Sequence, residues 1–268
     1  MYRKFVIFTD VDGTLIDSER YSWKDASQAV SLIRKRKIPL VLCSSKTKRE
    51  IEVLRKEIKN KNPFIVENGS AIFIPKNYFD FDFDYSYKKG RYYVIQLGEK
   101  YNRIIKALWK IKKLKGIKVS GFKDMSVKDL SKDCGLTIKK ARLAKKREFS
   151  EPFILKRGNI EDIKKAMNKM GLTYMKGRRY HYIMGDCDKG EATKILIGLF
   201  KRKYKNIVSV ALGDSFSDLP MLKSTDIAII VKMQKDKYDS KLLKYGFLKK
   251  AKGIGPKGWN STILDLIK

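Results

Sequence analysis

Residues 4–14 read Lys4-Phe-Val-Ile-Phe-Thr-Asp10-Val-Asp12-Gly13-Thr14, and this stretch decides the fold. Its first six residues form a short, nearly continuous apolar run of β-branched and aromatic side chains, which predicts a buried strand. Asp10 and Asp12 follow directly and are one residue apart, so both side chains lie on the same side of an extended segment. Gly13 lets the chain turn away without covering them. We therefore expect two carboxylates at the carboxyl end of a parallel sheet, where open α/β folds bind ligands.

Paired carboxylates at such a sheet edge have a definite chemistry. They suit a hard divalent cation, and one can attack phosphorus while the other transfers a proton. The same pattern also occurs in ordinary turns whose carboxylates are solvated. Its position behind a buried strand favours the functional interpretation over the turn.

The residues that follow alternate between strand and helix patterns. Residues 24–37 have apolar positions at helical spacing, with Ser22 as the expected N-cap and Asp25 at N3. Residues 40–43 and 64–66 are buried strands, and Thr47 with Glu50 three residues later starts the helix between them. This alternation predicts a parallel sheet with right-handed crossovers.

The pattern changes between residues 80 and 89, where Asp alternates with Phe and Tyr. Beyond this point we expect a strand at 92–97, helices near 101–115, 126–134, 137–146 and 160, and strands near 152–156, 173 and 182. After residue 185 the first pattern returns, with strands at 207–212 and 226–231 and a C-terminal helix. The chain is therefore predicted to be α/β: a Rossmann-like parallel-sheet core (1–82 and 183–268) with an inserted α+β cap domain (83–182).

Net charge and cysteine content limit the partners and the cellular compartment that we expect for this chain. The chain of 268 residues has a net charge of +32, which suits a nucleic acid, a small anionic substrate or simply solvated helix faces. No helix-turn-helix, aromatic RNA-binding or zinc-finger pattern is present, so we expect no nucleic-acid partner. Three widely spaced cysteines support neither a disulfide framework nor a thiolate zinc site, which favours the cytoplasm. The N-terminal apolar run is too short for a signal peptide, and we expect no membrane span.

Four separated motifs together resemble the haloacid dehalogenase-like phosphohydrolases, and the resemblance covers the whole chain. They are Asp10-x-Asp12-Gly-Thr, Ser44 at the end of the strand 40–43, Lys189 in Asp-Lys-Gly, and Gly213-Asp214-Ser-Phe-Ser-Asp218. Ser44 or Lys189 alone means little, but the order and placement of the set are specific. The length of the insert resembles the α/β cap of the sugar-phosphatase branch.

The resemblance implies roles for the motif residues. Asp10 would attack phosphorus to form an aspartyl-phosphate, and Asp12 would protonate the leaving alkoxide and later deprotonate the hydrolytic water. Ser44 and Lys189 would bind the remaining phosphoryl oxygens. The cofactor would be Mg²⁺, held by Asp10, Asp214 and the backbone carbonyl of Asp12, with Asp218 as a direct or water-mediated ligand.

Three local segments resemble one family within that superfamily more closely. Residues 43–47, 64–75 and 144–153 are similar to the mannosyl-3-phosphoglycerate phosphatases, and Ser44-Ser45-Lys46 stands where other sugar phosphatases have Thr-Gly-Arg. This implies an Mg²⁺-dependent phosphatase that converts mannosyl-3-phosphoglycerate, a small phosphorylated sugar-glycerate, into mannosylglycerate and phosphate.

Substrate-binding residues are expected in the loops under the cap and in the cap itself. Asn68 can reach a sugar hydroxyl, and Gly69 beside it allows close backbone approach. Arg178, Arg179 and His181 lie near the return crossing, where a guanidinium can clamp a carboxylate. The candidate set is Ser45, Lys46, Asn68, Gly69, Arg179 and His181. A structural role for His181, and solvated positions for Arg142 and Arg147, stay open alternatives.

The sequence is also compatible with parts of three rival functions. The first is a phosphatase for another phosphosugar or for nucleic-acid 3′-phosphate ends. The second is a non-catalytic binding protein with a vestigial acidic cluster, which the presence of all four charged motifs disfavours. The third is a phosphomannomutase, which is disfavoured because no second phosphate site is recognisable.

Overall fold

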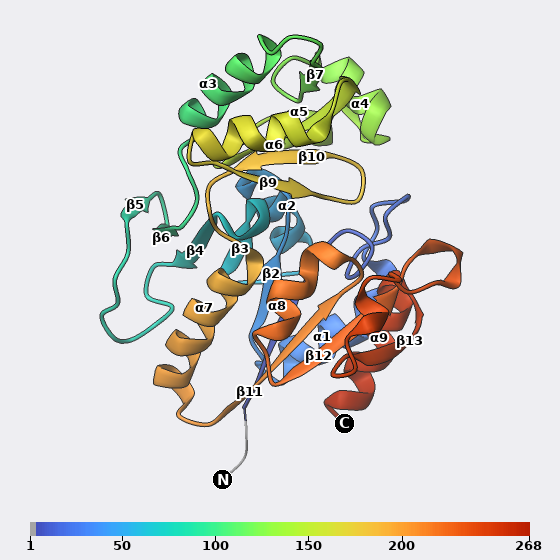
Figure 1. Cartoon of the computed structure of the whole chain (residues 1–268). Coiled ribbons are helices and arrows are strands. Elements are labelled where there is room, and N and C mark those ends of the chain that lie inside the picture. The colour runs from blue at the N-terminus through green and yellow to red at the C-terminus, as the bar shows by residue number, and fades with distance from the viewer. Residues whose placement is uncertain (1–3) are drawn as a thin grey trace.

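The computed structural model describes residues 4–268 and contains two β-sheets with helices packed on both (Figure 1). Residues 1–3, the start of the predicted core segment 1–82, lie outside the described residues. The strands are β1 (Lys4–Thr9), β2 (Leu40–Cys43), β3 (Phe64–Val66), β4 (Ala71–Pro75), β5 (Tyr87–Lys89), β6 (Tyr92–Gln96), β7 (Lys118–Gly121), β8 (Ser150–Arg157), β9 (Thr173–Lys176), β10 (His181–Met184), β11 (Ile207–Gly213), β12 (Ile227–Lys232) and β13 (Lys249–Ile254). The helices are α1 (Ser27–Lys35), α2 (Lys48–Glu57), α3 (Tyr101–Lys112), α4 (Val127–Cys134), α5 (Ile138–Ala144), α6 (Ile160–Lys169), α7 (Lys189–Tyr204), α8 (Leu219–Lys223) and α9 (Gly255–Leu266). The short 3₁₀ turns are η1 (Lys24–Ala26), η2 (Glu67–Gly69), η3 (Phe216–Asp218), η4 (Gln234–Asp236) and η5 (Leu242–Lys244).

The larger sheet is nine-stranded, in the order β13-β12-β11-β1-β2-β3-β4-β6-β5. From β13 to β3 neighbouring strands are parallel, and β4, β6 and β5 extend the sheet in antiparallel fashion. β1 lies between β11 and β2, so the residues after it emerge in the middle of the carboxyl edge. The predicted fold class, a Rossmann-like core with an α+β insert, is confirmed.

Helices cover both faces of this sheet. Ile7 packs with α1, α2 and α9 on one face, whereas Val6 and Phe8 pack with α7 and α8 on the other. Because both faces of β1 are buried, its sequence is an apolar run rather than an alternating pattern. The indole of Trp259, fully buried in α9, donates a hydrogen bond to Thr9 Oγ1 at 3.0 Å, which ties the C-terminal helix to the end of β1.

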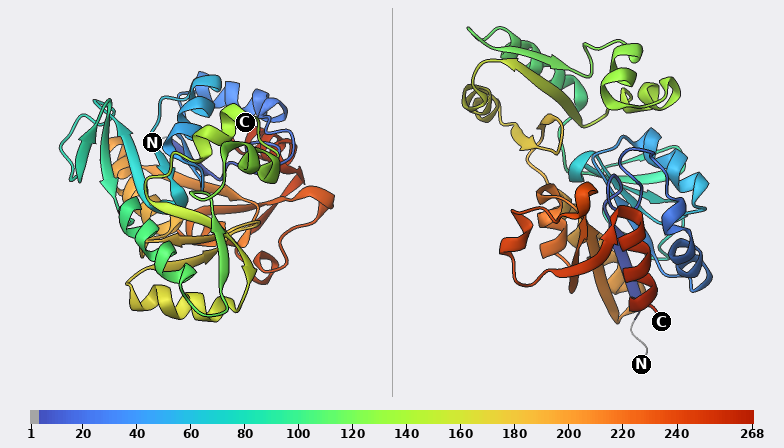
Figure 2. Two further views of the ribbon diagram at one scale, coloured as in Figure 1. Left: turned by 90° about the horizontal axis from the view of Figure 1, so that it is seen from above. Right: turned by 90° about the vertical axis from the view of Figure 1, so that its right-hand side faces the viewer.

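The smaller sheet is antiparallel, in the order β7-β8-β10-β9, and forms the upper part of the molecule (Figure 2). α3 and α6 pack against one face through a cluster that includes Phe153 and Ile183. The neighbouring residue Tyr182 points to the opposite face, which α4 and α5 cover in part and which overlooks the larger sheet. We call this part the cap.

The predicted boundary after residue 82 is wrong for two strands. β5 and β6 fall inside the segment 83–182, yet β6 pairs with β4 along its whole length in the larger sheet. We therefore propose that the cap begins after β6. The two crossings between core and cap touch, because a Cβ on Gly185 would lie 2.6 Å from the amide nitrogen of Glu99. Glycine is required where two backbones approach this closely.

Two local predictions differ in their outcome. Thr47 and Glu50 form the expected capping box of α2, with the Thr47 amide donating to Glu50 at 2.9 Å. The helix predicted for 24–37 is instead the turn η1 followed by α1, whose N-cap Ala26 carries no side-chain cap, so Ser22 does not cap it.

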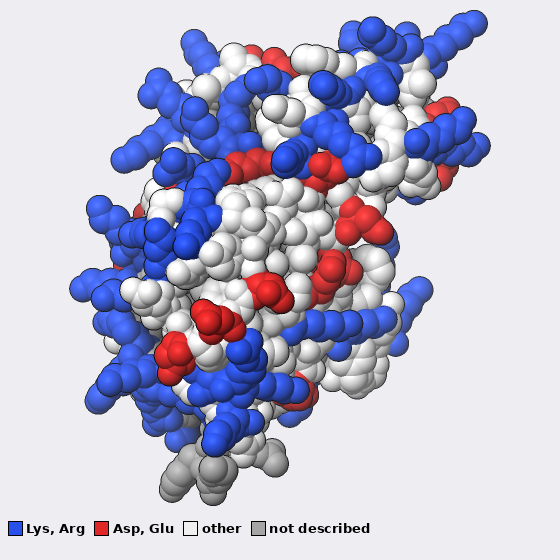
Figure 3. Space-filling view, turned by 90° about the vertical axis from the view of Figure 1, so that its left-hand side faces the viewer, with Lys and Arg blue, Asp and Glu red and all other residues white. Residues whose placement is uncertain are grey.

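The surface is basic over both parts of the chain. On the face seen in Figure 3, Lys and Arg side chains lie on both the cap and the core, around a central area of uncharged and acidic residues, and are not confined to one groove. This distribution matches the interpretation of the charge as solvated faces. Within residues 4–268, none of the helices combines the length and the hydropathy that crossing a bilayer requires.

Candidate active site

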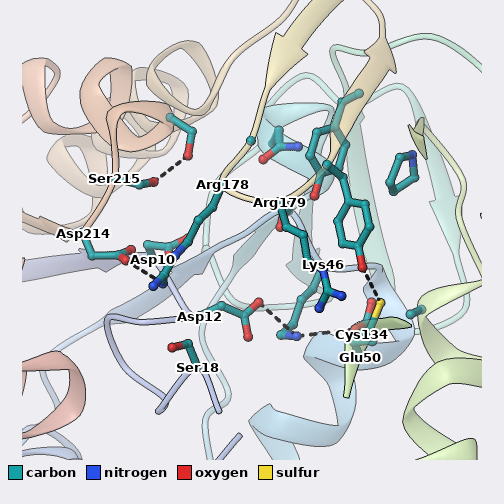
Figure 4. A pocket seen from close by; sticks show the side chains of 18 of the residues that line it. Asp10, Asp12, Ser18, Lys46, Glu50, Cys134, Arg178, Arg179, Asp214 and Ser215 are labelled. Atoms are coloured by element: carbon teal, nitrogen blue, oxygen red, sulfur yellow. Dashed lines mark hydrogen bonds and ion pairs between the residues drawn. The ribbon is translucent and has the colours of Figure 1, made fainter. Parts of the chain in front are cut away.

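A cavity of about 480 Å³ lies between the carboxyl edge of the larger sheet and the cap (Figure 4). Its core wall includes Asp10, Asp12, Lys46 and Asp214, and Pro152, Met175 and Tyr182 from the cap sheet are among the residues that close it from above. A volume of this size is typical of small-molecule sites.

Three aspartates meet at the floor of the cavity. Carboxylate oxygens of Asp10, Asp214 and Asp218 lie within 4.8 Å of one another, and all three residues are buried. Burial together with the charge of Asp218 raises the pKa of Asp10 to about 7. The pKa of Asp214 is also raised well above its ordinary value, by burial and then by the charges of Asp10 and Asp218.

Lys189 neutralises only part of this negative charge. Its ammonium group lies 2.7 Å from Asp10 Oδ1 and 2.6 Å from Asp218 Oδ1. Burial lowers the pKa of Lys189, but the two carboxylates outweigh this effect and hold it well above its usual value, so the side chain is charged. Asp214 receives no hydrogen bond from Lys189, and its Oδ2 has no hydrogen-bond partner among the described residues.

The donor set fits a hard cation. An orphaned, buried carboxylate oxygen beside two further carboxylates is what Mg²⁺ prefers. Burial first, and then the charges of the neighbouring carboxylates, raise the pKa values of Asp10 and Asp214, and a cation would relieve this crowding of negative charge. Gly13 keeps this place open, because a Cβ there would lie 2.6 Å from Asp214 Oδ2 and its φ is +87°. The side chain of Asp12 is outside the cluster.

Asp12 is held by the start of α2. Lys46 Nζ lies 3.0 Å from Asp12 Oδ2 and 3.5 Å from Glu50 Oε1, while the other oxygen of Glu50 caps the helix. Burial lowers the pKa of Lys46, but Asp12 and Glu50 outweigh it and raise the pKa. Lys46, predicted to bind substrate, therefore reaches the cavity already paired with Asp12. Glu50 was not predicted as a site residue, although its place in the capping box was.

The loop between β3 and β4 lies beside the cavity. Asn68 lines it in a left-handed conformation (φ 63°), and its buried Nδ2 has no hydrogen-bond partner among the described residues. Ser45 lines the cavity, whereas Ser44 is buried next to it and accepts a hydrogen bond from the Lys46 amide at 3.2 Å. Gly69 was expected to allow close backbone approach to substrate. Instead it packs against the backbone just before Lys189, because a Cβ there would lie 2.0 Å from the carbonyl oxygen of Asp188.

The cap candidates separate into two groups. Arg178 and Arg179 line the cavity, and Arg178 Nη1 lies 3.6 Å from Asp214 Oδ2. Arg179 stacks on Tyr180 and pairs with Asp133 at 3.7 Å. His181 is not among the lining residues.

His181 is a structural residue of the cap sheet. Its ring stacks on Phe153, and its nitrogens contact the Tyr174 hydroxyl at 2.7 Å and Lys176 Nζ at 3.2 Å. These contacts favour the structural alternative for His181, and its role in binding substrate stays a prediction. Successive side chains of β10 point to opposite faces of the cap sheet, so His181 lies on the face opposite to Tyr182, which lines the cavity.

A buried ion pair joins core and cap next to the cavity. Arg147 Nη2 lies 3.2 Å from Glu67 Oε2, and the two side chains are only 3% and 0% exposed. The same guanidinium donates to the carbonyl oxygen of Ser45 at 3.0 Å. Burial raises the pKa of Glu67 against the opposing effect of Arg147. The alternative of a solvated Arg147 is therefore wrong. It could not be corrected from local sequence, because the partner Glu67 lies 80 positions away.

Comparisons with known proteins identify the family. A family model described as haloacid dehalogenase-like hydrolase matches residues 7–242. A glucosyl-3-phosphoglycerate/mannosyl-3-phosphoglycerate phosphatase from Methanococcoides burtonii is 45% identical over 98% of this chain and 97% of its own length. A mannosyl-3-phosphoglycerate phosphatase from Pyrococcus furiosus is 38% identical over 84% of this chain and 90% of its own length.

Solved structures agree on the fold. The sucrose-phosphatase of Synechocystis sp. superposes with a TM-score of 0.60 at 11% identity, over 98% of each chain. A haloacid dehalogenase-like hydrolase from Bacteroides thetaiotaomicron gives 0.67 at 13% identity, over 99% of this chain and 100% of that one. The chain thus belongs to the haloacid dehalogenase-like hydrolases and, among them, to the glucosyl- and mannosyl-3-phosphoglycerate phosphatase family.

Proposed function

We propose that this chain hydrolyses mannosyl-3-phosphoglycerate to mannosylglycerate and phosphate. The observation that carries the proposal is the convergence of the carboxylates of Asp10, Asp214 and Asp218, with the Lys189 ammonium group between Asp10 and Asp218, at the floor of a cavity of about 480 Å³. Such a floor can hold a transferring phosphoryl group, and the cavity has room for a small sugar-glycerate above it.

The cofactor belonging to this proposal is Mg²⁺. Asp10, Asp214 and Asp218 would hold it through their side chains and Asp12 through its backbone carbonyl. Bound there, it would neutralise charge on the phosphoryl oxygens.

The chain's own residues then divide the chemistry. Asp10 attacks phosphorus; the bond to the leaving oxygen breaks, and an aspartyl-phosphate forms. Asp12 must first be protonated in place of its ion pair with Lys46. It then gives this proton to the departing alkoxide and later takes one from the water that attacks the aspartyl-phosphate, which releases phosphate and restores Asp10. Lys189 and Ser44 stabilise the phosphoryl oxygens, and loss of one such donor costs about two to three orders of magnitude in rate.

Substrate recognition is assigned to the cavity walls. Lys46, Arg178 and Arg179 present positive charge to a substrate that carries both a phosphate and a carboxylate. Asn68 Nδ2, which has no hydrogen-bond partner within residues 4–268, would donate to a sugar hydroxyl. Ser45 completes this wall beside Lys46.

The cytoplasm is the proposed location. Cys43 and Cys187 are buried free thiols and Cys134 is a partly buried one, which matches a reducing compartment.

Glucosyl-3-phosphoglycerate is a second candidate substrate. It is favoured by a specific observation: relatives 45% and 42% identical to this chain, from Methanococcoides burtonii and Persephonella marina, are named for both sugars. The two substrates differ at one hydroxyl configuration, which a contact such as that of Asn68 can discriminate.

A panel assay tests the proposal. Phosphate release is measured with Mg²⁺ on mannosyl- and glucosyl-3-phosphoglycerate, on unrelated phosphosugars and on a 3′-phosphorylated oligonucleotide. The proposal predicts the highest kcat/KM for mannosyl-3-phosphoglycerate. A higher kcat/KM for glucosyl-3-phosphoglycerate would establish the second candidate instead, and preference for the oligonucleotide would overturn both.

A further inference from the structure

Arg178 is a cap side chain that reaches the floor of the core. It lies in the loop between β9 and β10, with its side chain 47% exposed, yet its Nη1 is 3.6 Å from Asp214 Oδ2 (Figure 4). The absence of a side chain at Gly13 makes this approach feasible, because a Cβ there would lie 3.2 Å from the same nitrogen. The cap and the acidic cluster are therefore in direct electrostatic contact.

The oxygen that Arg178 faces is the one that a cation needs. Asp214 Oδ1 accepts a hydrogen bond from the Thr14 hydroxyl at 3.2 Å, whereas Oδ2 has no hydrogen-bond partner among the described residues. The Lys189 ammonium group donates hydrogen bonds to Asp10 and Asp218. Asp214 is thus the member of the cluster that Lys189 leaves unneutralised, and the Arg178 guanidinium, at 3.6 Å, forms the ion pair with Asp214 seen among the described residues.

We propose that Arg178 and the divalent cation compete for Asp214 Oδ2, so that cation binding releases Arg178 from the core. Arg178 then has a second position, in which the released guanidinium contacts the anionic part of the substrate; this part rests on the proposed function. Arg178 thereby couples cap position to cation occupancy, as a positioning and specificity residue rather than a member of the reacting set.

Coupling between two ligands of one group is reciprocal. If the guanidinium competes with the cation, its removal must tighten cation binding, and cation binding must loosen the loop that carries Arg178. Coupling of this kind is typically about five-fold or more in affinity.

Calorimetric titration of Mg²⁺ into the full chain without substrate tests this. Arg178→Met should tighten Mg²⁺ binding by about five-fold or more. Arg179→Met is the matched control, because it removes the same charge from the same loop but its guanidinium pairs with Asp133 within the cap. Its Mg²⁺ affinity should stay close to that of the wild type. Equal effects of the two variants, weaker binding by Arg178→Met, or no Mg²⁺ binding by the wild type would each overturn the inference.

Hydrogen exchange supplies a readout independent of affinity. Mg²⁺ without substrate should speed exchange of the amides of residues 178 and 179 in the wild type and have no such effect in Arg178→Met. Exchange that is unchanged or slowed by Mg²⁺ in the wild type would contradict the release step.

Phosphate-release assays on the same preparations separate the two proposals. A wild type that hydrolyses none of the phosphosugars, combined with tighter Mg²⁺ binding by Arg178→Met, would overturn the proposed function and leave the competition standing. A wild type that is active, combined with unchanged Mg²⁺ affinity in Arg178→Met, would overturn the competition alone.

Discussion

Replacing Arg147 by methionine should destabilise the folded chain by about 3–5 kcal/mol, because it leaves a buried carboxylate without its counter-charge. The structure sets this scale: Glu67 is fully buried and accepts hydrogen bonds from the amides of Glu148 at 2.8 Å and Phe149 at 3.1 Å and from the Ser150 hydroxyl at 2.8 Å. These two amides and the hydroxyl remain in the variant, but the positive charge of the Arg147 guanidinium is lost. For a chain of this size the loss corresponds to a fall of roughly 6–20 °C in the unfolding midpoint, measurable by circular dichroism.

A double-mutant cycle distinguishes the ion pair from simple loss of packing. Glu67→Gln should be similarly destabilising, and adding it to Arg147→Met should cost much less than the sum of the two, since no uncompensated charge is then buried. The exposed pair of Glu161 and Lys164 in the same cap is the control, and Glu161→Gln should leave the midpoint unchanged. Additive effects of the Glu67 and Arg147 substitutions would refute the reasoning.

Three further outcomes follow from the site and its surroundings. Chelation by EDTA should stop phosphate release and added Mg²⁺ should restore it; an unaltered rate in chelator would remove the cation from the account. Arg179→Met should raise KM more than it lowers kcat, because the side chain lines the cavity without touching the aspartate cluster, and steady-state kinetics with an unchanged KM would place it outside the binding site. Burial alone would raise the pKa of Asp226, but hydrogen bonds from the Ser209 hydroxyl and amide outweigh it and lower the pKa. The ionised form therefore contributes stability above the unfolded pKa that is lost as pH falls toward the folded value. Asp226→Asn should then lose less stability than the wild type between neutral and acid pH in urea titrations, and parallel pH profiles would disprove this.

Local sequence was sufficient for the centre of the fold. The apolar run at Lys4–Thr9 predicted β1 because both faces of that strand are buried, and the two carboxylates after it lie at the predicted sheet edge. The meeting of Asp214, Asp218 and Lys189 with Asp10 was implied by the family resemblance rather than by local sequence, and their side chains do lie together.

The edges of the sheet were not predictable in the same way. β13 carries lysines at Lys249, Lys250 and Lys252, as exposed edge strands commonly do, so it lacks an apolar signal. β6 was assigned to the cap because the composition changes before it, but its pairing partner β4 determines its place in the core. Such pairing is a long-range interaction that local pattern does not encode.

Polar residues that are buried by a distant partner were also missed. Arg147 is a surface-type residue in sequence, and its burial depends on the counter-charge of Glu67 and on hydrogen bonds to distant acceptors such as the Ser45 carbonyl oxygen. His181 was named for its position near the return crossing, but its ring packs on Phe153, a contact that local sequence does not encode. In both cases the deciding contact comes from another strand or loop.

The central claim is that Asp10 carries the phosphoryl group during turnover. Wild-type enzyme is mixed with saturating mannosyl-3-phosphoglycerate and Mg²⁺, quenched in acid during steady state, digested and analysed by mass spectrometry. The account predicts one phosphoryl group on the peptide that contains Asp10, and neither this adduct nor turnover in Asp10→Asn. A phosphorylated peptide elsewhere in the chain, or undiminished turnover in Asp10→Asn, would contradict it.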